Sequence, residues 1–162
     1  MKADLRVYAL LDPAVAGGHA LPDLAALIAP ATTLVQLRDK HGTTRGMVEE
    51  ARALLAVLRP AGIPLLINDR VDVALAAQAE GVHIGQDDMA VEDARRLLGP
   101  DAIIGLSIKT AAQAAAAPLD LLSYVAIGGV FATTSKDNTS SPIGLDGLKR
   151  IAGIIDSIGL KK

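Results

Sequence analysis

The chain has 162 residues, enough for one domain with a sizeable core, and we expect residues 1–162 to form a single domain. Hydrophobic residues make up 51% of it and aromatic residues only 2%, so Ala, Val, Leu and Ile must build that core. A net charge of −2 argues against a broad surface for nucleic acid, and the absence of cysteine excludes disulfides and thiolate metal sites.

The N-terminal sequence MKADLRVYALLDP lacks the apolar run of a signal peptide. No stretch approaches the roughly 18 apolar residues of a membrane span, and the lack of cysteine fits a reducing compartment. We therefore expect a soluble cytoplasmic protein that binds neither a membrane nor nucleic acid.

Short apolar runs alternate with stretches of helical periodicity along the whole chain. The expected strands are residues 6–11, 33–38, 64–69, 81–85, 102–107 and 124–129. The expected helices are residues 21–28, 43–59, 71–79, 89–98, 110–117 and 145–155. Thr43, Thr44 and Thr110 mark helix starts, while Pro60 and Gly62 mark the end of the second helix.

Six β–α units with nearly continuous apolar strands predict an α/β domain with a parallel sheet. An open dinucleotide-binding sheet and a TIM-type (β/α)8 barrel share this pattern. The first strand is followed by LLDPAVAGG and not by G-x-G-x-x-G, which argues against the open sheet. Polar residues also follow almost every strand after the first, and a barrel gathers such strand ends around one mouth. We therefore favour the barrel.

The second strand leads into QLRDK, in which Gln36, Arg38 and Lys40 occupy alternate positions and should project to the same side. Arg38 can bind a phosphate through two hydrogen bonds, and Lys40 adds a point charge. The alternative is a pair of exposed charges neutralised by Asp39 and solvent.

Carboxylates follow the next two strands. Asp69 comes after Asn68 at the end of the third strand, and Asp88 follows the fourth. Magnesium prefers one or two carboxylates together with water and phosphate oxygens, so these two side chains could hold Mg²⁺. The alternative is that each aspartate caps the helix that follows it.

The loop GGVFATTSKDNTSS after the sixth strand combines glycines, hydroxyls and a lysine, which suits a phosphate group. A flexible surface loop rich in Ser and Thr is the alternative. His83 should face away from Val82 and Ile84 and line the site as a hydrogen-bonding group. Together these residues predict a site for a pyrophosphate held by Mg²⁺, Arg and Lys, without a protein nucleophile.

Five motifs in order, QLRDK, the Asn68–Asp69 pair, HIGQDD, GLS at 105–107 and FATTSK at 131–136, resemble the thiamine-phosphate synthase family. That family has a (β/α)8 barrel and joins a hydroxymethylpyrimidine diphosphate to a carboxythiazole phosphate, with release of pyrophosphate. The resemblance implies Mg²⁺ at Asp69 and Asp88. It assigns the pyrimidine diphosphate to Gln36, Arg38, Lys40, Asn68, Ser107 and Lys136, and the thiazole phosphate to Thr133, Thr134 and Ser135.

The family pattern continues with two more β–α units after the sixth, whereas this sequence ends at DSIGLKK. We therefore expect a barrel that lacks its last two units, with apolar sheet edges that favour a homo-oligomer. Two other functions stay open at this point. One is a thiazole tautomerase-like isomerase, and the other is a non-catalytic phosphate-binding remnant of the fold.

Overall fold

The computed structural model describes residues 3–132 and 141–159. Its sheet has six parallel strands in sequential order, each paired with the next along the chain. The strands are β1 (Tyr8–Leu11), β2 (Leu34–Leu37), β3 (Leu65–Asn68), β4 (Gly81–Ile84), β5 (Ile103–Ile108) and β6 (Tyr124–Ile127).

A helix follows every strand. These are α1 (Leu21–Ile28), α2 (Thr44–Leu58), α3 (Val71–Ala77), α4 (Val91–Leu98), α5 (Ala111–Ala116) and α6 (Gly144–Ile158). Short 3₁₀ turns stand at η1 (Pro13–Val15), η2 (Ala29–Ala31), η3 (Arg59–Ala61) and η4 (Leu119–Leu121). All six predicted strands and all six predicted helices are thus confirmed, with ends that shift by a few residues.

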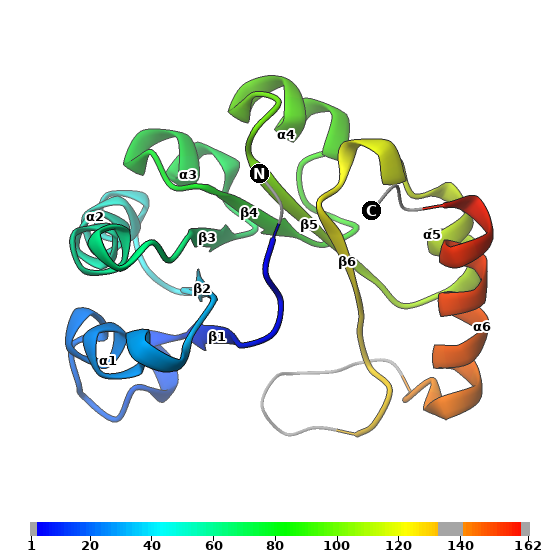
Figure 1. Cartoon of the computed structure of the whole chain (residues 1–162), viewed down its shortest axis with the longest axis horizontal. Helices are drawn as coiled ribbons and strands as arrows, with labels where there is room; N and C mark the ends of the chain where they lie inside the picture. Colours follow the sequence, from blue (N-terminus) through cyan, green and yellow to red (C-terminus); the bar gives the residue numbers. More distant parts are fainter. Residues whose placement is uncertain (1–2, 133–140, 160–162) are drawn as a thin grey trace.

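The sheet curves into a half-barrel with the helices along its outer side (Figure 1). The expected α/β class and parallel sheet are confirmed, while a closed barrel of eight units is not seen in residues 3–132 and 141–159. Within that part of the chain β1 and β6 each pair on one side only, so the sheet has two open edges.

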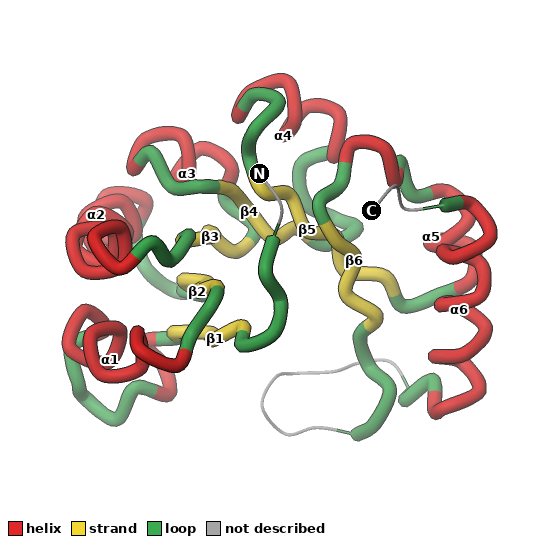
Figure 2. The backbone as a smooth tube through the Cα atoms, viewed as in Figure 1, coloured by secondary structure: helices red, strands yellow, loops and turns green. Residues whose placement is uncertain are grey.

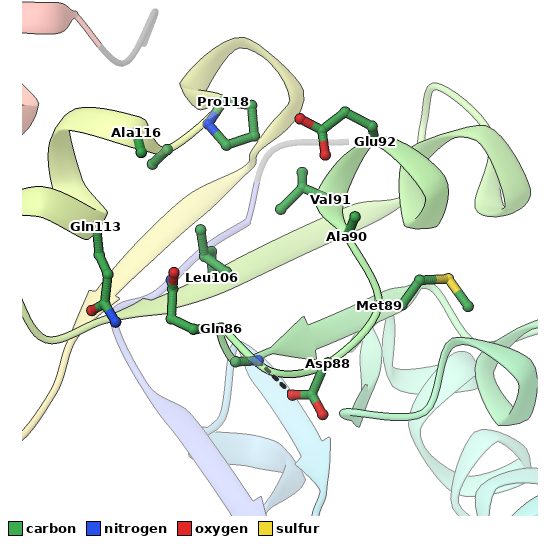
Figure 3. A pocket seen from close by; sticks show the side chains of 12 residues that line it. Gln86, Asp88, Met89, Ala90, Val91, Glu92, Leu106, Gln113, Ala116 and Pro118 are labelled. Atoms are coloured by element: carbon green, nitrogen blue, oxygen red, sulfur yellow. Dashed lines mark hydrogen bonds between the residues drawn. The ribbon is translucent and has the colours of Figure 1, made fainter.

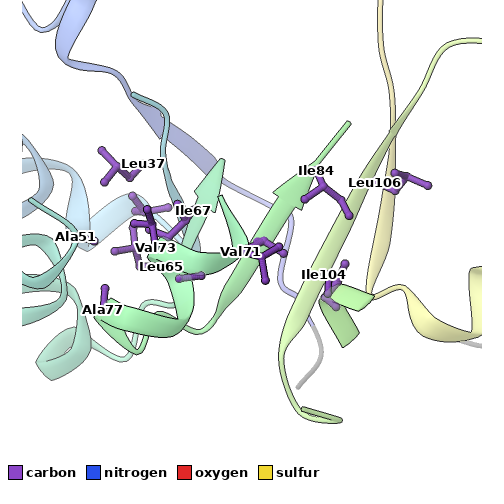
Figure 4. Close-up of a cluster of buried hydrophobic side chains, with 14 of the residues drawn as sticks. Leu37, Ala51, Leu65, Ile67, Val71, Val73, Ala77, Ile84, Ile104 and Leu106 are labelled. Carbon is purple, nitrogen blue, oxygen red and sulfur yellow. The ribbon is translucent and has the colours of Figure 1, made fainter. Parts of the chain in front are cut away.

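The strands alternate between two apolar environments, as a parallel barrel sheet requires. Alternate residues such as Leu37, Ile67 and Ile104 face the helices and join the main core (Figure 4). The opposite positions form a second cluster on the concave side, made by Leu34, Leu66, Ile103 and Tyr124. The concave side is therefore packed at its base, and apart from Tyr8 and Tyr124 its polar side chains lie towards the carboxyl ends of the strands.

Local signals in the sequence explain where the helices begin and end. The Thr43 hydroxyl accepts a hydrogen bond from the Gly46 N–H, and Thr110 forms a capping box with Gln113. The second helix stops at the turn through Pro60, where Gly62 takes a left-handed φ of 72°. Among the described residues no helix is long and apolar enough to cross a membrane.

Candidate active site

The strands give way to loops at their carboxyl ends (Figure 2). Most of the polar residues that the sequence singled out lie at these ends. In a parallel barrel-type sheet this end carries the active site, because the loops there can vary without disturbing the core. The residues described at this end are Gln36, Arg38, Lys40, Asn68, Asp69, His83, Gln86, Asp88 and Ser107. Thr133, Thr134, Ser135 and Lys136 lie outside the described residues.

Both cations of QLRDK are held by carboxylates of neighbouring strands. The Arg38 guanidinium forms an ion pair with Asp12, which follows β1, and the two side chains are only 24% and 12% exposed. The Lys40 ammonium lies 2.6 Å from the Asp69 carboxylate, which follows β3. The two cations therefore lie on opposite sides of the end of β2, each beside an acid that an incoming anion could replace.

Asp69 has a backbone conformation that marks it as a special position. Its φ is 62°, in the left-handed region that side chains other than Gly, Asn and Asp rarely adopt. The Asp69 N–H donates to the His83 carbonyl oxygen at 2.8 Å, which ties this turn to the neighbouring strand. Strained backbone of this kind clusters at functional sites.

Asp88 lies close enough to Asp69 for the two carboxyl groups to interact. Burial raises the pKa of the Asp88 carboxyl above its ordinary value, the Gly85 N–H opposes that rise, and the Asp69 carboxylate adds to it. The Asp88 carboxylate accepts the Gly85 N–H at 2.7 Å (Figure 3). Two adjacent carboxylates that raise a pKa in this way are favourable ligands for a divalent cation.

The structure excludes helix capping as the role of either aspartate. The N-cap of α3 is Arg70 and that of α4 is Ala90, and neither makes a side-chain cap hydrogen bond. Asp69 and Asp88 precede these caps and hold loop positions instead. Within the described residues no cluster of three or more His, Cys, Asp or Glu side chains could hold a metal, so a cation here would rest on this carboxylate pair.

A chain of hydrogen bonds crosses the concave face of the sheet. The Gln36 amide nitrogen donates to the Tyr8 hydroxyl, and the Tyr8 and Tyr124 hydroxyls lie 2.8 Å apart. The Tyr124 hydroxyl lies 2.9 Å from Nδ1 of His83. Nε2 of His83 in turn lies 2.9 Å from Oγ of Ser107. Side chains of β1, β2, β4, β5 and β6 are thereby joined in one network.

The aromatic rings of this network are packed as well as hydrogen-bonded. The ring of Tyr124 stacks on His83 with centroids 5.6 Å apart and meets Tyr8 edge-on at 5.9 Å. Gly105 leaves the space for the Tyr124 ring, since a Cβ there would lie 2.5 Å from Cε1 of Tyr124. Burial raises the pKa of both tyrosines, so both hydroxyls keep their protons at neutral pH. The prediction that His83 is a hydrogen-bonding group on this face is confirmed.

A small groove of about 200 Å³ runs beside the site, between the loop after β4 and helix α5 (Figure 3). Met89, Val91, Leu106 and Pro118 supply apolar walls, and Asp88 stands at one end. Its size lies below the roughly 300–1,000 Å³ of pockets that enclose drug-sized ligands. The groove therefore borders the site and does not replace it.

Sequence reasoning missed three residues of the site, Asp12, Tyr8 and Tyr124. Asp12 follows the first strand in the same way that Asp69 follows the third. A search for polar residues directly after every apolar strand could therefore have found it. Tyr8 and Tyr124 are the only tyrosines in the sequence, and each begins a strand on the concave side. No spacing along the chain showed that these two would meet, because 116 residues separate them.

Comparisons with known proteins find relatives over most of the chain. A family model described as thiamine monophosphate synthase matches residues 7–159. The chain is 48% identical to a thiamine-phosphate synthase from Agrobacterium fabrum over 155 residues, which cover 95% of this chain and 70% of that protein. It is 46% identical to one from Chloroflexus aurantiacus, covering 91% of this chain and 68% of the relative.

A solved structure, the thiamine phosphate pyrophosphorylase from Pyrococcus furiosus, superposes with a TM-score of 0.74 at 31% identity. The match covers 93% of this chain and 72% of that one. The chain thus spans about 70% of the length of the relatives it matches.

Proposed function

The chain belongs to the thiamine monophosphate synthase family, and from that premise we propose that it couples a hydroxymethylpyrimidine diphosphate to a carboxythiazole phosphate and releases pyrophosphate. The observation that carries this proposal is the grouping of Arg38, Lys40, Asp69 and Asp88 at one end of the sheet. Two cations and two adjacent carboxylates match the needs of a magnesium diphosphate.

In the proposed reaction the bond between the pyrimidine methylene carbon and the diphosphate oxygen breaks first. The electron pair leaves with the diphosphate, and the resulting pyrimidine-stabilised cation is captured by the thiazole nitrogen. The carboxyl group of the thiazole then leaves as carbon dioxide, and its electron pair stays with the ring, which takes up a proton. Such a reaction needs no protein nucleophile. The protein contributes by positioning both substrates and by stabilising the negative charge that develops on the diphosphate.

The residues fit a role for Mg²⁺ at Asp69 and Asp88. Burial, together with the Asp69 carboxylate, raises the pKa of Asp88, and a divalent cation would relieve the repulsion between the two carboxylates. The Lys40 ammonium already lies against Asp69, so this position favours a positive charge. When bound there, the metal would supply charge to neutralise the leaving diphosphate.

We assign the remaining contacts by family resemblance together with placement in the fold. Gln36, Asn68 and Ser107 lie on β2, β3 and β5 and would hold the pyrimidine diphosphate with Lys136. Thr133, Thr134 and Ser135 would bind the thiazole phosphate.

The test is formation of the coupled product from both substrates in the presence of Mg²⁺. We expect product and pyrophosphate from the parent chain. Arg38→Ala should weaken binding of the diphosphate by about 1.5–3 kcal/mol, the scale of a hydrogen bond to a charged group. Arg96→Ala is the matched control, because Arg96 is exposed and pairs only locally with Asp93 among the described residues.

Two results would overturn the proposal. One is isomerisation of the thiazole phosphate without coupling, which indicates a tautomerase. The other is binding of both substrates with no turnover, which indicates a non-catalytic phosphate-binding protein.

A further inference from the structure

The hydrogen-bond chain on the concave face has a direction, and that direction follows from a count of protons. Gln36 presents its amide nitrogen to Tyr8, so the Tyr8 hydroxyl accepts this bond. The single proton of Tyr8 is then left for the Tyr124 oxygen, 2.8 Å away. The Tyr124 proton is left for Nδ1 of His83, 2.9 Å away.

The count continues through the imidazole. A neutral histidine that accepts at Nδ1 carries its proton on Nε2. Nε2 therefore donates to Oγ of Ser107 at 2.9 Å, and the Ser107 hydroxyl accepts. The hydroxyl proton of Ser107 takes no part in this series of hydrogen bonds, so it can be donated to another group.

From this count we propose that Gln36, through Tyr8, Tyr124 and His83, orients the Ser107 hydroxyl as a hydrogen-bond donor toward the bound anion. His83 is then held as the neutral Nε2–H tautomer. Tyr8, Tyr124 and His83 are positioning residues in this scheme. The identity of the anion as a diphosphate rests on the proposed function, whereas the direction of the chain and the tautomer of His83 do not.

Two physical features keep the chain in this state. Gln36 is 3% exposed and Tyr124 is 5% exposed, so water cannot readily supply alternative partners. Each tyrosine hydroxyl has one proton to donate. The Gln36 amide, at one end of the series, therefore determines which group donates in each of the following hydrogen bonds. With an acceptor at position 36 the order would reverse, and Ser107 would donate to His83 and turn its lone pairs to the anion.

The first experiment measures the tautomer of His83 by ¹⁵N NMR of the imidazole nitrogens, without any ligand. The other two histidines, His19 and His41, are exposed, so a variant with both changed to Gln leaves a single imidazole signal. We expect the Nε2–H tautomer in that background. We expect Gln36→Glu, which offers only acceptors at neutral pH, to convert it to the Nδ1–H tautomer.

The second experiment measures binding of inorganic pyrophosphate with Mg²⁺ in a double-mutant cycle. Ser107→Ala should weaken binding by about tenfold or more, because it removes one hydrogen bond to a charged group. Gln36→Glu should weaken binding in the parent, and much less in the Ser107→Ala background. Simple repulsion between the new carboxylate and the anion would cost the same in both backgrounds.

The outcomes separate the two levels of the proposal. An Nδ1–H tautomer in the parent, or an Nε2–H tautomer that persists in Gln36→Glu, overturns the direction of the chain whatever the protein catalyses. If Gln36→Glu does not fold, the tautomer of the parent still decides the point. If Gln36→Glu weakens pyrophosphate binding equally in the parent and in Ser107→Ala, Gln36 does not act on the anion through Ser107, and that part of the proposal is overturned. Loss of coupling activity with the expected tautomers would count against the proposed function alone.

Discussion

Gly105 gives the sharpest test of how the concave face is packed. In Gly105→Ala the added Cβ would lie 2.5 Å from Cε1 of Tyr124 and closer still to Cζ and the hydroxyl. Because Tyr124 is 5% exposed, its ring cannot swing into solvent without losing its packing. Displacing the ring breaks hydrogen bonds to Tyr8 and His83, at about 1 kcal/mol each, and overpacking adds about 1–3 kcal/mol. We expect a loss of about 3–5 kcal/mol in the free energy of unfolding, measured by urea denaturation.

Gly153→Ala is the matched control for that substitution. Gly153 lies inside α6, its φ is not in the left-handed region, and a Cβ there would meet nothing within 4 Å. Alanine should therefore stabilise the protein by about 0.5–1 kcal/mol. A second control uses Tyr124→Leu as the background. In that background Gly105→Ala should lower the free energy of unfolding far less, because the Tyr124 ring is gone. If the free energy of unfolding of Gly105→Ala lies within about 1 kcal/mol of that of the parent, the packing argument is refuted.

Three further predictions concern charge and surface. Asp88→Asn should stabilise the metal-free protein as pH rises above about 4. The reason is that the pKa of Asp88 is raised in the folded protein, so ionising this carboxyl costs more free energy in the folded than in the unfolded state. Denaturation curves that show an equal stabilisation at pH 3 would contradict this. Arg95 donates to four backbone carbonyls, so Arg95→Ala should lower the unfolding free energy by about 2–3 kcal/mol, against less than about 0.5 for exposed Arg96→Ala. We also expect self-association through the open sheet edges, where Leu10 is 55% exposed; sedimentation of a monomer at micromolar concentration, unchanged by Leu10→Lys, would argue against it.

The secondary structure was readable from the sequence because local and tertiary preferences agree. The helix over 21–28 was predicted with both ends correct, and α2 begins one residue after Thr43, whose hydroxyl caps it. Five of the six expected strands were one or two residues too long, as at Arg6 and Asp69, and the fifth was shifted by one residue. A polar residue next to an apolar run continues the alternating pattern that predicts a strand. In the structure such residues lie outside the paired strands, in the loops.

The site was predicted less completely because its contacts join distant strands. Strand ends were visible as polar residues after apolar runs, so Asp69, Asp88 and Ser107 could be named in advance. The partners of the cations could not, since the pairing of Arg38 with Asp12 depends on the adjacency of β1 and β2. Gln36, Arg38 and Lys40 contact three different protein groups, those of Tyr8, Asp12 and Asp69. That all three face one pyrophosphate stays a prediction.

The charges at the end of the sheet lead to a last prediction, about the order in which ligands bind. Among the described residues the site holds two cations, Arg38 and Lys40, against three carboxylates, Asp12, Asp69 and Asp88. This net negative charge repels a free diphosphate, and Mg²⁺ alone would find only two carboxylates, one of them already paired with Lys40.

Metal and diphosphate should therefore bind together. A cation held by Asp69 and Asp88 would neutralise this carboxylate pair, and a diphosphate could supply further oxygen ligands, so that Lys40 could leave Asp69 and contact the anion. In calorimetry we expect weak binding of Mg²⁺ alone and of pyrophosphate alone, and at least a tenfold gain in the affinity of each when the other is present. Asp88→Asn should remove most of that gain while leaving the fold intact, because an Asn side chain can still accept the Gly85 N–H. Tight binding of Mg²⁺ to the free protein, unaffected by Asp88→Asn, would show that the cation does not depend on this carboxylate pair.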